Sequence, residues 1–343
     1  MPELRQDPAS REWIVFSTER AKRPDQFRTV TVREPRPAYS ESCPFCGGNE
    51  SQTPPEKFAF RADSKPNGPG WLVRVVPNKF AALVPRGDLT RRHESGFFRK
   101  ADGVGHHEVI IETPRHDLDL ATMEADQIEH VILAYRQRYN QLKKDPRVEA
   151  VIIFRNHGKG AGTSLIHAHS QLIATPVVPN LIRERFEAAS NYYDDTGRCL
   201  HAEILEKELE VGSRVVDEND AFAAFHPFAS HQPFETWIMP KAVRASFGSI
   251  RDDESRHFAS ILRRALYRLH EGLDDPDFNY VIHTASVRDE NQPYYGWHLQ
   301  IVPRIMTPAG FEIGSGMTIN TSLPEQTAAY IREIEVPEAI AVQ

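Results

Sequence analysis

The feature that most constrains the fold of this 343-residue chain is an order of segments that occurs twice. Each half contains an apolar run typical of a strand, then a helical pattern, then a second apolar run: 108–112, 128–142 and 150–154 in the first half, and 235–239, 258–269 and 279–283 in the second. Equivalent positions lie 127 to 130 residues apart. Such steady spacing indicates an internal duplication; the alternative is a chance match between two unrelated α+β domains.

The order of these segments also restricts the architecture. They follow one another too closely for a doubly wound parallel sheet, and proline-rich connections separate them. We therefore expect an α+β protein with two tandem domains, residues 1–179 and 180–343, each an antiparallel sheet with a helix packed on it. A further strand is expected at 71–76 and a short helix at 181–192, whereas residues 21–70, with eight prolines, should be irregular.

Composition and charge exclude several classes of protein. The formal net charge is −7, which does not favour an electrostatic hold on nucleic acid. No apolar stretch reaches the roughly 18 residues that a membrane-spanning helix needs, and the first residues lack the basic-then-apolar order of a signal peptide. Three cysteines cannot form a disulfide framework, so we expect a cytoplasmic protein.

The most informative segment runs from Asn156 to Gln171. It has three glycines within five residues, whose backbone N–H groups could approach a phosphate, and Ser164 and Gln171 could add hydrogen bonds to phosphate oxygens. If the strand is extended here, His167 and His169 share one face. A neutral imidazole at that place could attack a phosphorus atom. The alternatives are a metal-binding pair and a hydrogen-bonded structural pair.

A second patterned segment contains Cys43 and Cys46, followed by two glycines. Two thiolates three residues apart are typical of half of a zinc site or of a redox pair. A closed tetrahedral zinc site would need two more protein ligands. No thioredoxin-like βαβ unit surrounds the pair, which favours the metal over the redox function.

Together these segments resemble the galactose-1-phosphate uridylyltransferase family of the histidine-triad superfamily. The resemblance rests on motifs in the family's order and spacing: Arg20-Ala-Lys-Arg-Pro24, Cys43-Pro-Phe-Cys46, Pro77-Asn-Lys-Phe80, Asn156, Ser164-x-x-His167-x-His169-x-Gln171, Pro227-Phe228, Trp237-Ile-Met-Pro240 and Trp297-His-Leu-Gln300. It covers roughly residues 3–335 and implies two tandem histidine-triad-like domains. The chain also looks close to the ADP-glucose phosphorylase branch of the family, and a homodimer is left open.

By position, the resemblance makes His169 the nucleophile that becomes covalently nucleotidylated, with Gln171 and Ser164 holding the phosphate oxygens. The matching substrate contacts would come from Arg20, Arg23, Asn78, Asn156 and Gly162. For the two arginines the alternative is a solvated basic turn. Ala168 stands where many uridylyltransferases have proline, which removes no reacting atom.

The resemblance also implies a structural zinc ion. Its ligands would be Cys43, Cys46, His116 and His167. Zinc bound to His167 would fix a ring beside the nucleophile without polarising the substrate. From the sequence alone, His106 and His107 remain rival ligands.

The second half should lack an equivalent site. Its His298-x-Gln300 mirrors the catalytic string without the glycine loop or the paired histidine. Some relatives hold a second metal here, on a glutamate and three histidines or on two cysteines and two histidines. This chain offers Glu184 and His283, but Gln300 stands at the place of the third histidine, and Cys199 lacks its partner cysteine. We expect His283 and His298 to be hydrogen-bonded interior residues.

The activity that we expect is uridylyl transfer in galactose metabolism. His169 would attack UDP-glucose, release glucose 1-phosphate and pass UMP to a hexose 1-phosphate. The alternative is ADP-glucose phosphorolysis, in which AMP passes to phosphate. Segments 297–303 and 310–316 resemble that branch, and Ser315 and Gly316 stand where the type enzyme has a tyrosine–glutamate pair that reads sugar hydroxyls. A non-catalytic nucleotide-binding protein, which would have lost the nucleophile, and a nucleotide hydrolase are further alternatives.

Overall fold

The structure is a computed structural model and describes residues 1–17, 23–28, 35–337 and 340. Arg20, one of the expected substrate contacts, lies outside the described residues. Across the described part of the chain, no helix is both long and apolar enough to cross a membrane.

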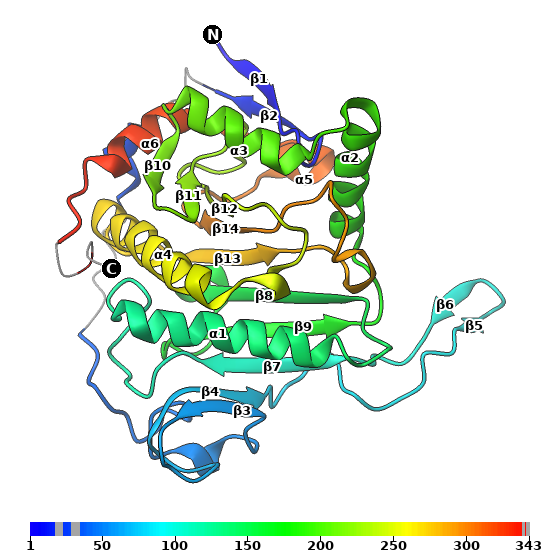
Figure 1. Cartoon of the computed structure of the whole chain (residues 1–343), viewed down its shortest axis with the longest axis vertical. Helices are drawn as coiled ribbons and strands as arrows, with labels where there is room; N and C mark the ends of the chain where they lie inside the picture. Colours follow the sequence, from blue (N-terminus) through cyan, green and yellow to red (C-terminus); the bar gives the residue numbers. More distant parts are fainter. Residues whose placement is uncertain (18–22, 29–34, 338–339, 341–343) are drawn as a thin grey trace.

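One ten-stranded antiparallel sheet runs through both halves of the chain, in the order β10-β11-β12-β14-β13-β8-β9-β7-β4-β3 (Figure 1). The strands are β3 (Phe58–Arg61), β4 (Trp71–Pro77), β7 (His106–Ile111), β8 (Ala150–His157), β9 (His169–Thr175), β10 (Val215–Glu218), β11 (Phe222–Phe225), β12 (Thr236–Pro240), β13 (Phe278–His283) and β14 (His298–Pro303). The two halves meet where β8 and β13 pair, with Phe154 opposite Val281. The expected α+β class is confirmed, and the sheets of the two halves are joined edge to edge.

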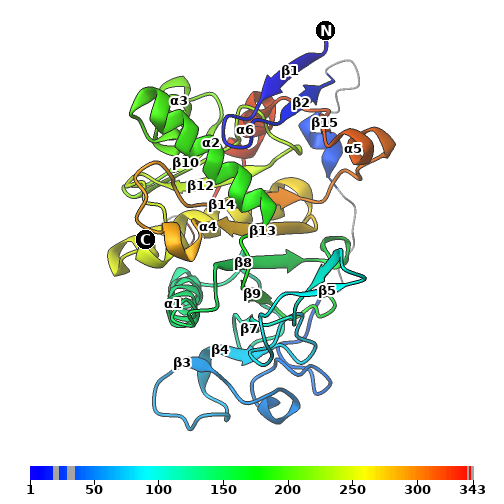
Figure 2. The same ribbon diagram turned by 90° about the vertical axis from the view of Figure 1, so that its right-hand side faces the viewer.

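Two long helices, α1 (Ala125–Leu142) and α4 (Asp252–Leu273), lie side by side on one face of this sheet (Figures 1 and 2). Apolar side chains at steps of three and four, such as Ile128 and Ile132, are fully buried against the strands. The first turn of α4 carries three acidic residues that complement the positive end of the helix dipole. The helix ends where Asp274 adopts the left-handed conformation.

Because side chains alternate along the strands, one face of the sheet packs against the helices and the other carries the candidate site residues. In β9, Leu172 and Ala174 face the helices and belong to the main core. Because side chains alternate along a strand, His169 and Gln171 point to the opposite face. The pattern of β14 repeats this arrangement at 298–301, as the duplication predicts.

The opposite face is covered differently in the two halves. In the second half, α2 (Asn180–Thr196) and α3 (Leu200–Val211) lie over the sheet, and Leu205 of α3 packs in one cluster with Trp237. In the first half, a loop around 43–46 packs there instead. The segments that cover this face of the sheet therefore differ between the two halves.

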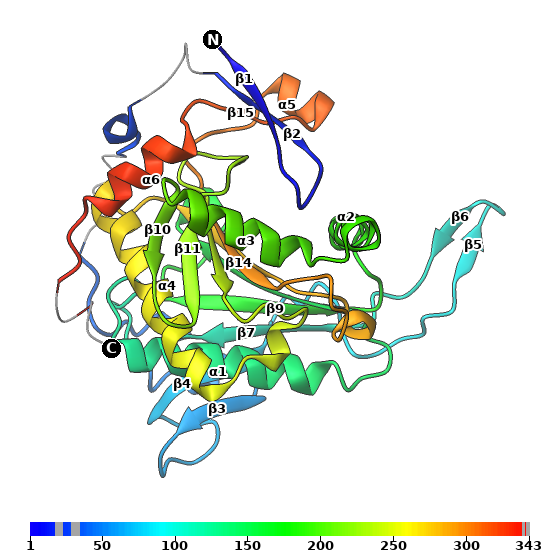
Figure 3. The same ribbon diagram turned by 45° about the horizontal axis from the view of Figure 1, so that its top comes forward.

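The N-terminal hairpin packs on the second half of the chain. β1 (Glu3–Gln6) pairs with β2 (Trp13–Phe16), and β2 runs parallel to β15 (Ile319–Asn320) (Figure 3). Ala9, between the two strands, is buried in the same cluster as Trp237. This small sheet therefore joins the first residues of the chain to a strand that precedes α6.

A two-stranded hairpin, β5 (Arg92–Glu94) and β6 (Phe98–Lys100), projects away from the body of the molecule (Figures 1 and 3). Its turn exposes Phe97 and Phe98. The remaining elements are α5 (Gly310–Ser315), α6 (Pro324–Arg332) and the short 3-10 helices η2 (Pro24–Phe27), η3 (Glu50–Gln52), η4 (Lys159–Ala161), η5 (Phe247–Ser249) and η6 (Val287–Asp289).

Candidate active site and metal centre

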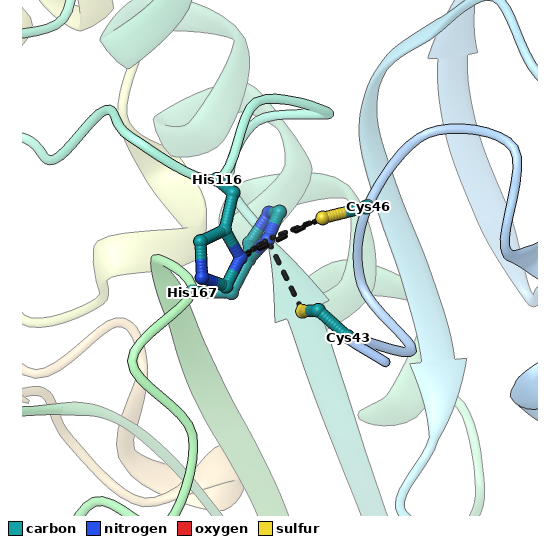
Figure 4. A group of neighbouring side chains, drawn as sticks. All are labelled: Cys43, Cys46, His116 and His167. Atoms are coloured by element: carbon teal, nitrogen blue, oxygen red, sulfur yellow. Dashed lines mark hydrogen bonds between the residues drawn. The ribbon is translucent and has the colours of Figure 1, made fainter. Parts of the chain in front are cut away.

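Four side chains from three separate segments meet beside the start of β9 (Figure 4). Cys43 and Cys46 come from the loop that covers the first half of the sheet, His116 from the connection after β7, and His167 from the residues just before β9. His116 is half-buried and the other three are buried. Their ligand atoms all lie within 4.8 Å of one another.

The distances in this cluster fit a tetrahedral zinc site. Nδ1 of His167 lies 3.3 Å from Nδ1 of His116, 3.5 Å from Sγ of Cys43 and 3.7 Å from Sγ of Cys46. Ligand atoms arranged tetrahedrally at the usual Zn–N and Zn–S lengths would be about 3.3 to 3.8 Å apart. Two thiolates and two imidazoles are also a donor set typical of structural zinc. Both the donor set and its spacing therefore suit a zinc ion.

A hydrogen bond and burial keep the His167 ring neutral, with the lone pair on Nδ1 available to a metal ion. Its Nε2–H donates to the carbonyl oxygen of Thr113 at 2.7 Å, so the lone pair of Nδ1 faces the cysteines. Burial lowers the pKa of His167 to about 4, which keeps the ring neutral. Burial also raises the pKa of the Cys43 thiol to about 11, so metal binding would displace a proton from it.

The two rival histidines lie elsewhere. Nε2 of His106 is 3.2 Å from the carboxylate of Asp145, and Nε2 of His107 is 2.8 Å from Oε1 of Gln171. Both histidines stand at the opposite end of β7 from the residues that pair with the start of β9. The structure therefore brings His116 and His167 to the cysteines, and not the rival pair.

His169 is held in a form suited to nucleophilic attack. Its Nδ1–H donates to the carbonyl oxygen of His167 at 2.8 Å, which leaves the lone pair of the ring on Nε2. Burial lowers the pKa of His169, so the ring is neutral near pH 7. Phe45 packs against the ring, with centroids 5.3 Å apart. No described residue forms a hydrogen bond with Nε2, and this atom is free to react.

Gln171 lies two residues beyond His169 on the same face of β9. Its Oε1 is 2.8 Å from Nε2 of His107 and 3.4 Å from Nδ2 of Asn78. Asn78 directly follows β4, and its backbone N–H donates to the carbonyl oxygen of His107 at 2.9 Å. The structure thus brings together two predicted site residues, Asn78 and Gln171. It adds His107, which sequence reasoning considered only as a metal ligand.

The glycine loop does not form the expected phosphate cradle. The backbone N–H of Gly160 donates to the carboxylate of Asp277, and the N–H groups of 161–163 donate to carbonyl oxygens within the loop. A Cβ on Gly158 would lie 1.7 Å from Oδ1 of Asp277, so close packing explains that glycine. Gly162 is exposed and has a φ of +90°, and it stays a predicted substrate contact.

The other expected substrate residues are dispersed around this end of the sheet. Asn156 is the last residue but one of β8, and its Oδ1 accepts a hydrogen bond from Nδ2 of Asn279 at 2.8 Å. Ser164 is exposed on the segment between the glycine loop and β9. Arg23 is exposed at the start of η2, which packs on α4 and α6. The roles of these residues stay predictions.

The mirrored position in the second half is closed. His298 is fully buried and stacks on Trp237, with ring centroids 4.3 Å apart. Nη1 of Arg185 donates to Nδ1 of His283 at 2.7 Å, and Nε2 of His283 is 2.7 Å from Oε1 of Gln300. The glutamate considered as a further ligand is exposed. Both histidines are interior residues, as expected. His283 is hydrogen-bonded, whereas Nδ1 of His298 lies 3.4 Å from the carbonyl oxygen of Gly296 and its Nε2 has no partner among the described residues. The fixed positive charge of Arg185 opposes a second metal ion there.

Comparison with known proteins now identifies the class. Residues 1–179 match the family described as galactose-1-phosphate uridyl transferase, N-terminal domain, and residues 185–338 match galactose-1-phosphate uridyl transferase, C-terminal domain. The protein therefore belongs to a class of two-domain enzymes that comprises nucleotidyltransferases and phosphorylases. More narrowly, the chain belongs to the galactose-1-phosphate uridyl transferase family.

Two branches of this family match nearly the whole chain. ADP-glucose phosphorylase from Arabidopsis thaliana is 37% identical over 338 residues, which cover 98% of this chain and 93% of that protein. Galactose-1-phosphate uridylyltransferase from Thermotoga maritima is 30% identical over 346 residues, which cover 98% and 99%. The sequence is thus more similar to the phosphorylase than to this uridylyltransferase.

Solved structures show the same order of similarity. The crystal structure of an ADP-glucose phosphorylase from Arabidopsis thaliana with bound ADP-glucose has a TM-score of 0.81 at 34% identity, covering 98% of this chain and 100% of that chain. A structure described as uridylyltransferase has a TM-score of 0.74 at 28% identity, covering 97% of each.

Proposed function

We propose that the protein transfers a nucleoside monophosphate from a sugar nucleotide through a covalent bond to Nε2 of His169. The observation that carries this proposal is the state of the His169 ring. The ring is neutral, its Nδ1–H is tied to the carbonyl oxygen of His167, and its lone pair is on a free Nε2. Such an arrangement is typical of an imidazole that acts as a nucleophile.

The transfer would take place in two displacements at one phosphorus atom. First, the Nε2 lone pair attacks the α-phosphorus, the bond to the sugar phosphate oxygen breaks, and sugar 1-phosphate leaves with the electron pair. Then an oxygen of the acceptor attacks the same phosphorus, and Nε2 recovers its lone pair. The Nδ1–H of His169 remains bonded to the carbonyl of His167 in both steps, so the ring needs no proton transfer.

The surrounding residues would bind and orient the substrate. Gln171 and Ser164 would donate to oxygens of the transferred phosphate. The nucleotide would be contacted by Arg20, Arg23, Asn78, Asn156 and Gly162. We propose that zinc is held by the four-residue cluster of Cys43, Cys46, His116 and His167, where it would serve as a structural tie.

As the particular activity, we propose ADP-glucose phosphorolysis, in which AMP passes from ADP-glucose to inorganic phosphate and the products are glucose 1-phosphate and ADP. The higher identity to the ADP-glucose phosphorylase supports it, 37% against 30%. The absence of the tyrosine–glutamate pair at Ser315 and Gly316 also supports it. This reverses the order of the two activities that the sequence alone favours.

Uridylyl transfer from UDP-glucose to a hexose 1-phosphate is the second candidate. A uridylyltransferase that is matched over 99% of its own length at 30% identity supports it. The catalytic string from Ser164 to Gln171 fits both activities equally well. The two candidates differ in the base of the donor and in the acceptor, and both can be varied in one assay.

The decisive experiment is to incubate the protein with each sugar nucleotide in the absence of an acceptor. With ADP-glucose, we expect one equivalent of glucose 1-phosphate per site and an intact protein heavier by one AMP, on an acid-labile and base-stable phosphoramidate. Phosphate should then remove the AMP as ADP. An adduct formed only with UDP-glucose, and discharged by galactose 1-phosphate, would favour the second candidate.

Two variants test the identity of the nucleophile. His169→Ala should form no adduct while its unfolding transition stays close to that of the wild type. The matched control is His298→Ala, at the mirrored and buried position, which should lose stability but still form the adduct. Folded, zinc-loaded wild-type protein that forms an adduct with neither nucleotide would overturn the covalent mechanism.

A further inference from the structure

The hydrogen bonds of His107 determine which of its ring nitrogens carries the proton. The backbone N–H of Ala82 donates to Nδ1 of His107 at 3.0 Å. A backbone N–H can only donate, so Nδ1 carries the lone pair. A neutral imidazole then has its hydrogen on Nε2. The nearest acceptor is Oε1 of Gln171, at 2.8 Å, and Nε2 of His107 therefore donates to that oxygen.

The orientation of Asn78 follows from the same kind of evidence. The backbone N–H of Phe80 donates to Oδ1 of Asn78 at 2.8 Å, so the other end of this amide is the nitrogen. Nδ2 of Asn78 lies 3.1 Å from Nε2 of His107 and 3.4 Å from Oε1 of Gln171. Because Nε2 of His107 carries a hydrogen and cannot accept, Oε1 of Gln171 is the acceptor for Asn78 as well. Oε1 of Gln171 thus receives two hydrogen bonds, one for each lone pair.

In this arrangement only the amide nitrogen of Gln171 lacks a hydrogen-bond partner among the described residues. Its amide oxygen is saturated by His107 and Asn78, and no described residue accepts a hydrogen bond from its amide nitrogen. If the amide were turned over, two donors would face the nitrogen and lose their acceptor, which costs free energy. The side chain therefore presents donors on the face of β9 that it shares with His169.

The second half of the chain shows what the same motif does without a substrate. Nη1 of Arg185 lies 2.7 Å from Nδ1 and 3.0 Å from Nε2 of His283. Because the amide nitrogen of Gln300 is bound to Glu235, Oε1 of Gln300 faces His283 and accepts from Nε2–H at 2.7 Å. There, however, the nitrogen of the Gln300 amide donates to Glu235, also at 2.7 Å. Both the amide oxygen and the amide nitrogen of Gln300 thus have a partner within the protein, whereas no described residue accepts from the amide nitrogen of Gln171. The contrast indicates that the open amide nitrogen of Gln171 is a feature of the reactive half.

We propose that His107 is a positioning residue: it fixes the amide of Gln171 so that both N–H groups are directed to the oxygens of the phosphate transferred to His169. This inference rests on the nucleotidyl transfer proposed above. Nδ1 of His107 also accepts the backbone N–H of Ala82, which lies between β4 and the projecting hairpin. One imidazole ring therefore contacts both this segment and the amide of Gln171.

The test uses variants that keep one or the other hydrogen bond of the ring. Gln at position 107 can place an amide N–H close to the position of Nε2, and His107→Gln keeps the donor to Gln171. Asn is shorter, and His107→Asn keeps an acceptor for Ala82 but cannot reach Gln171. The control is His106→Asn, at a neighbouring residue that contacts Asp145 instead. The measurement is the single-turnover rate of nucleotidyl-protein formation at saturating and at limiting donor.

We expect His107→Asn to slow the saturated rate by about 10- to 100-fold, because a donor misplaced by a fraction of an ångström stabilises the transition state poorly. His107→Gln should stay within about threefold of the wild type, and His106→Asn should have no effect. In a Gln171→Ala background, His107→Asn should cause no further loss, since it acts through Gln171. Melting temperature and zinc content should be unchanged in all of these variants.

Three results would overturn the proposal: an unchanged rate in His107→Asn, an equal loss in His107→Gln, or the same loss with and without Gln171. Failure of the proposed function itself looks different, because then the wild type would form no adduct with either ADP-glucose or UDP-glucose. In that case the positioning role falls with it.

Discussion

At the scale of single residues, His167 connects the candidate metal cluster to the proposed nucleophile, His169. Its Nδ1 faces the two cysteines, its Nε2–H is bonded to Thr113, and its carbonyl oxygen receives the Nδ1–H of His169. An ion bound to this ring would restrain the backbone that orients the nucleophile. A zinc ion in this cluster would thus combine a structural role with control of the His169 tautomer.

The zinc assignment predicts a paired effect of removing one ligand. Cys43→Ser should lower bound zinc well below one equivalent per chain and destabilise the protein by about 3 kcal/mol or more, because metal binding contributes to folding. Metal analysis and thermal unfolding measure the two effects. The control is Cys199→Ser, since Cys199 lies at the start of α3, away from the cluster, and should keep its zinc. Full zinc occupancy in Cys43→Ser would refute the assigned site.

The sequence predicts residues that belong to a family motif or whose contacts are close in the chain. It does not predict residues whose contacts come from distant parts of the chain. The four predicted metal ligands are brought together as the resemblance implies. Asp277 was not foreseen, because it reaches the glycine loop from 117 residues away. The role of His107 was not foreseen either, since its partners Gln171 and Ala82 are set only by strand register and loop packing.

At the scale of elements, a buried polar network lies behind the reactive strand and joins the two halves. The hydroxyl of Tyr135 in α1 donates to Ser170 of β9 at 2.5 Å and lies 2.6 Å from that of Tyr280 in β13. Arg155 of β8 pairs with Glu112 just after β7. Because one member comes from each of several neighbouring elements, the network fixes how β9 sits between β7 and β8.

The buried ion pairs of Arg155 predict a large loss of stability on substitution. The guanidinium contacts Glu112 and Asp119 at 3.0 Å each, and all three side chains are nearly inaccessible. Arg155→Met should lower the free energy of unfolding by about 3 to 5 kcal/mol, since two carboxylates lose their buried partner. Arg198→Met, which removes an arginine paired at the surface, should cost less than about 1 kcal/mol. Urea unfolding of both variants compares the two, and equal losses would contradict this account.

Periodicity predicted the central strands and α1 to within about three residues of their ends, and it predicted α4 too short, by six residues at its start and four at its end. It missed β3, whose four residues follow a proline-rich stretch, and the short strands β10 and β11. It also could not foresee that the two sheets are continuous. The pairing of β8 with β13 is made by residues 121 to 129 positions apart and leaves no local pattern in the sequence.

At the scale of the whole molecule, one duplication has produced two unequal halves. Over the second half, α2 and α3 bury the mirrored strand, and the guanidinium of Arg185 contacts the ring nitrogens of His283. Over the first half, the cysteine-bearing loop packs against β9 but leaves Nε2 of His169 free of described hydrogen-bond partners. The strand pattern is the same in both halves. The segments packed over the sheet therefore determine which half could bind a substrate at its histidine.

The packing of the N-terminal hairpin on the second half predicts a pH dependence of stability. His231 lies 3.7 Å from the carboxylate of Asp7 and 3.5 Å from that of Glu12. Burial alone would lower the pKa of His231, but the carboxylates of Asp7, Glu235 and Glu12 outweigh burial and raise it to about 9. A pKa raised on folding stabilises the protein fully below the unfolded value of about 6.5, and this stabilisation is lost as the pH rises through 9.

The free energy of unfolding should therefore fall by about 3 kcal/mol between pH 6 and pH 10 through this one group. Denaturant titrations across that range measure the fall. His231→Gln should remove this part of the slope, because an amide does not titrate and cannot pair with the carboxylates of the hairpin. His93→Gln, in the projecting hairpin, is the matched control and should keep the wild-type slope. If the His231→Gln protein loses stability with pH as steeply as the wild type, the ion pairs of His231 do not hold the N-terminal hairpin to the second half.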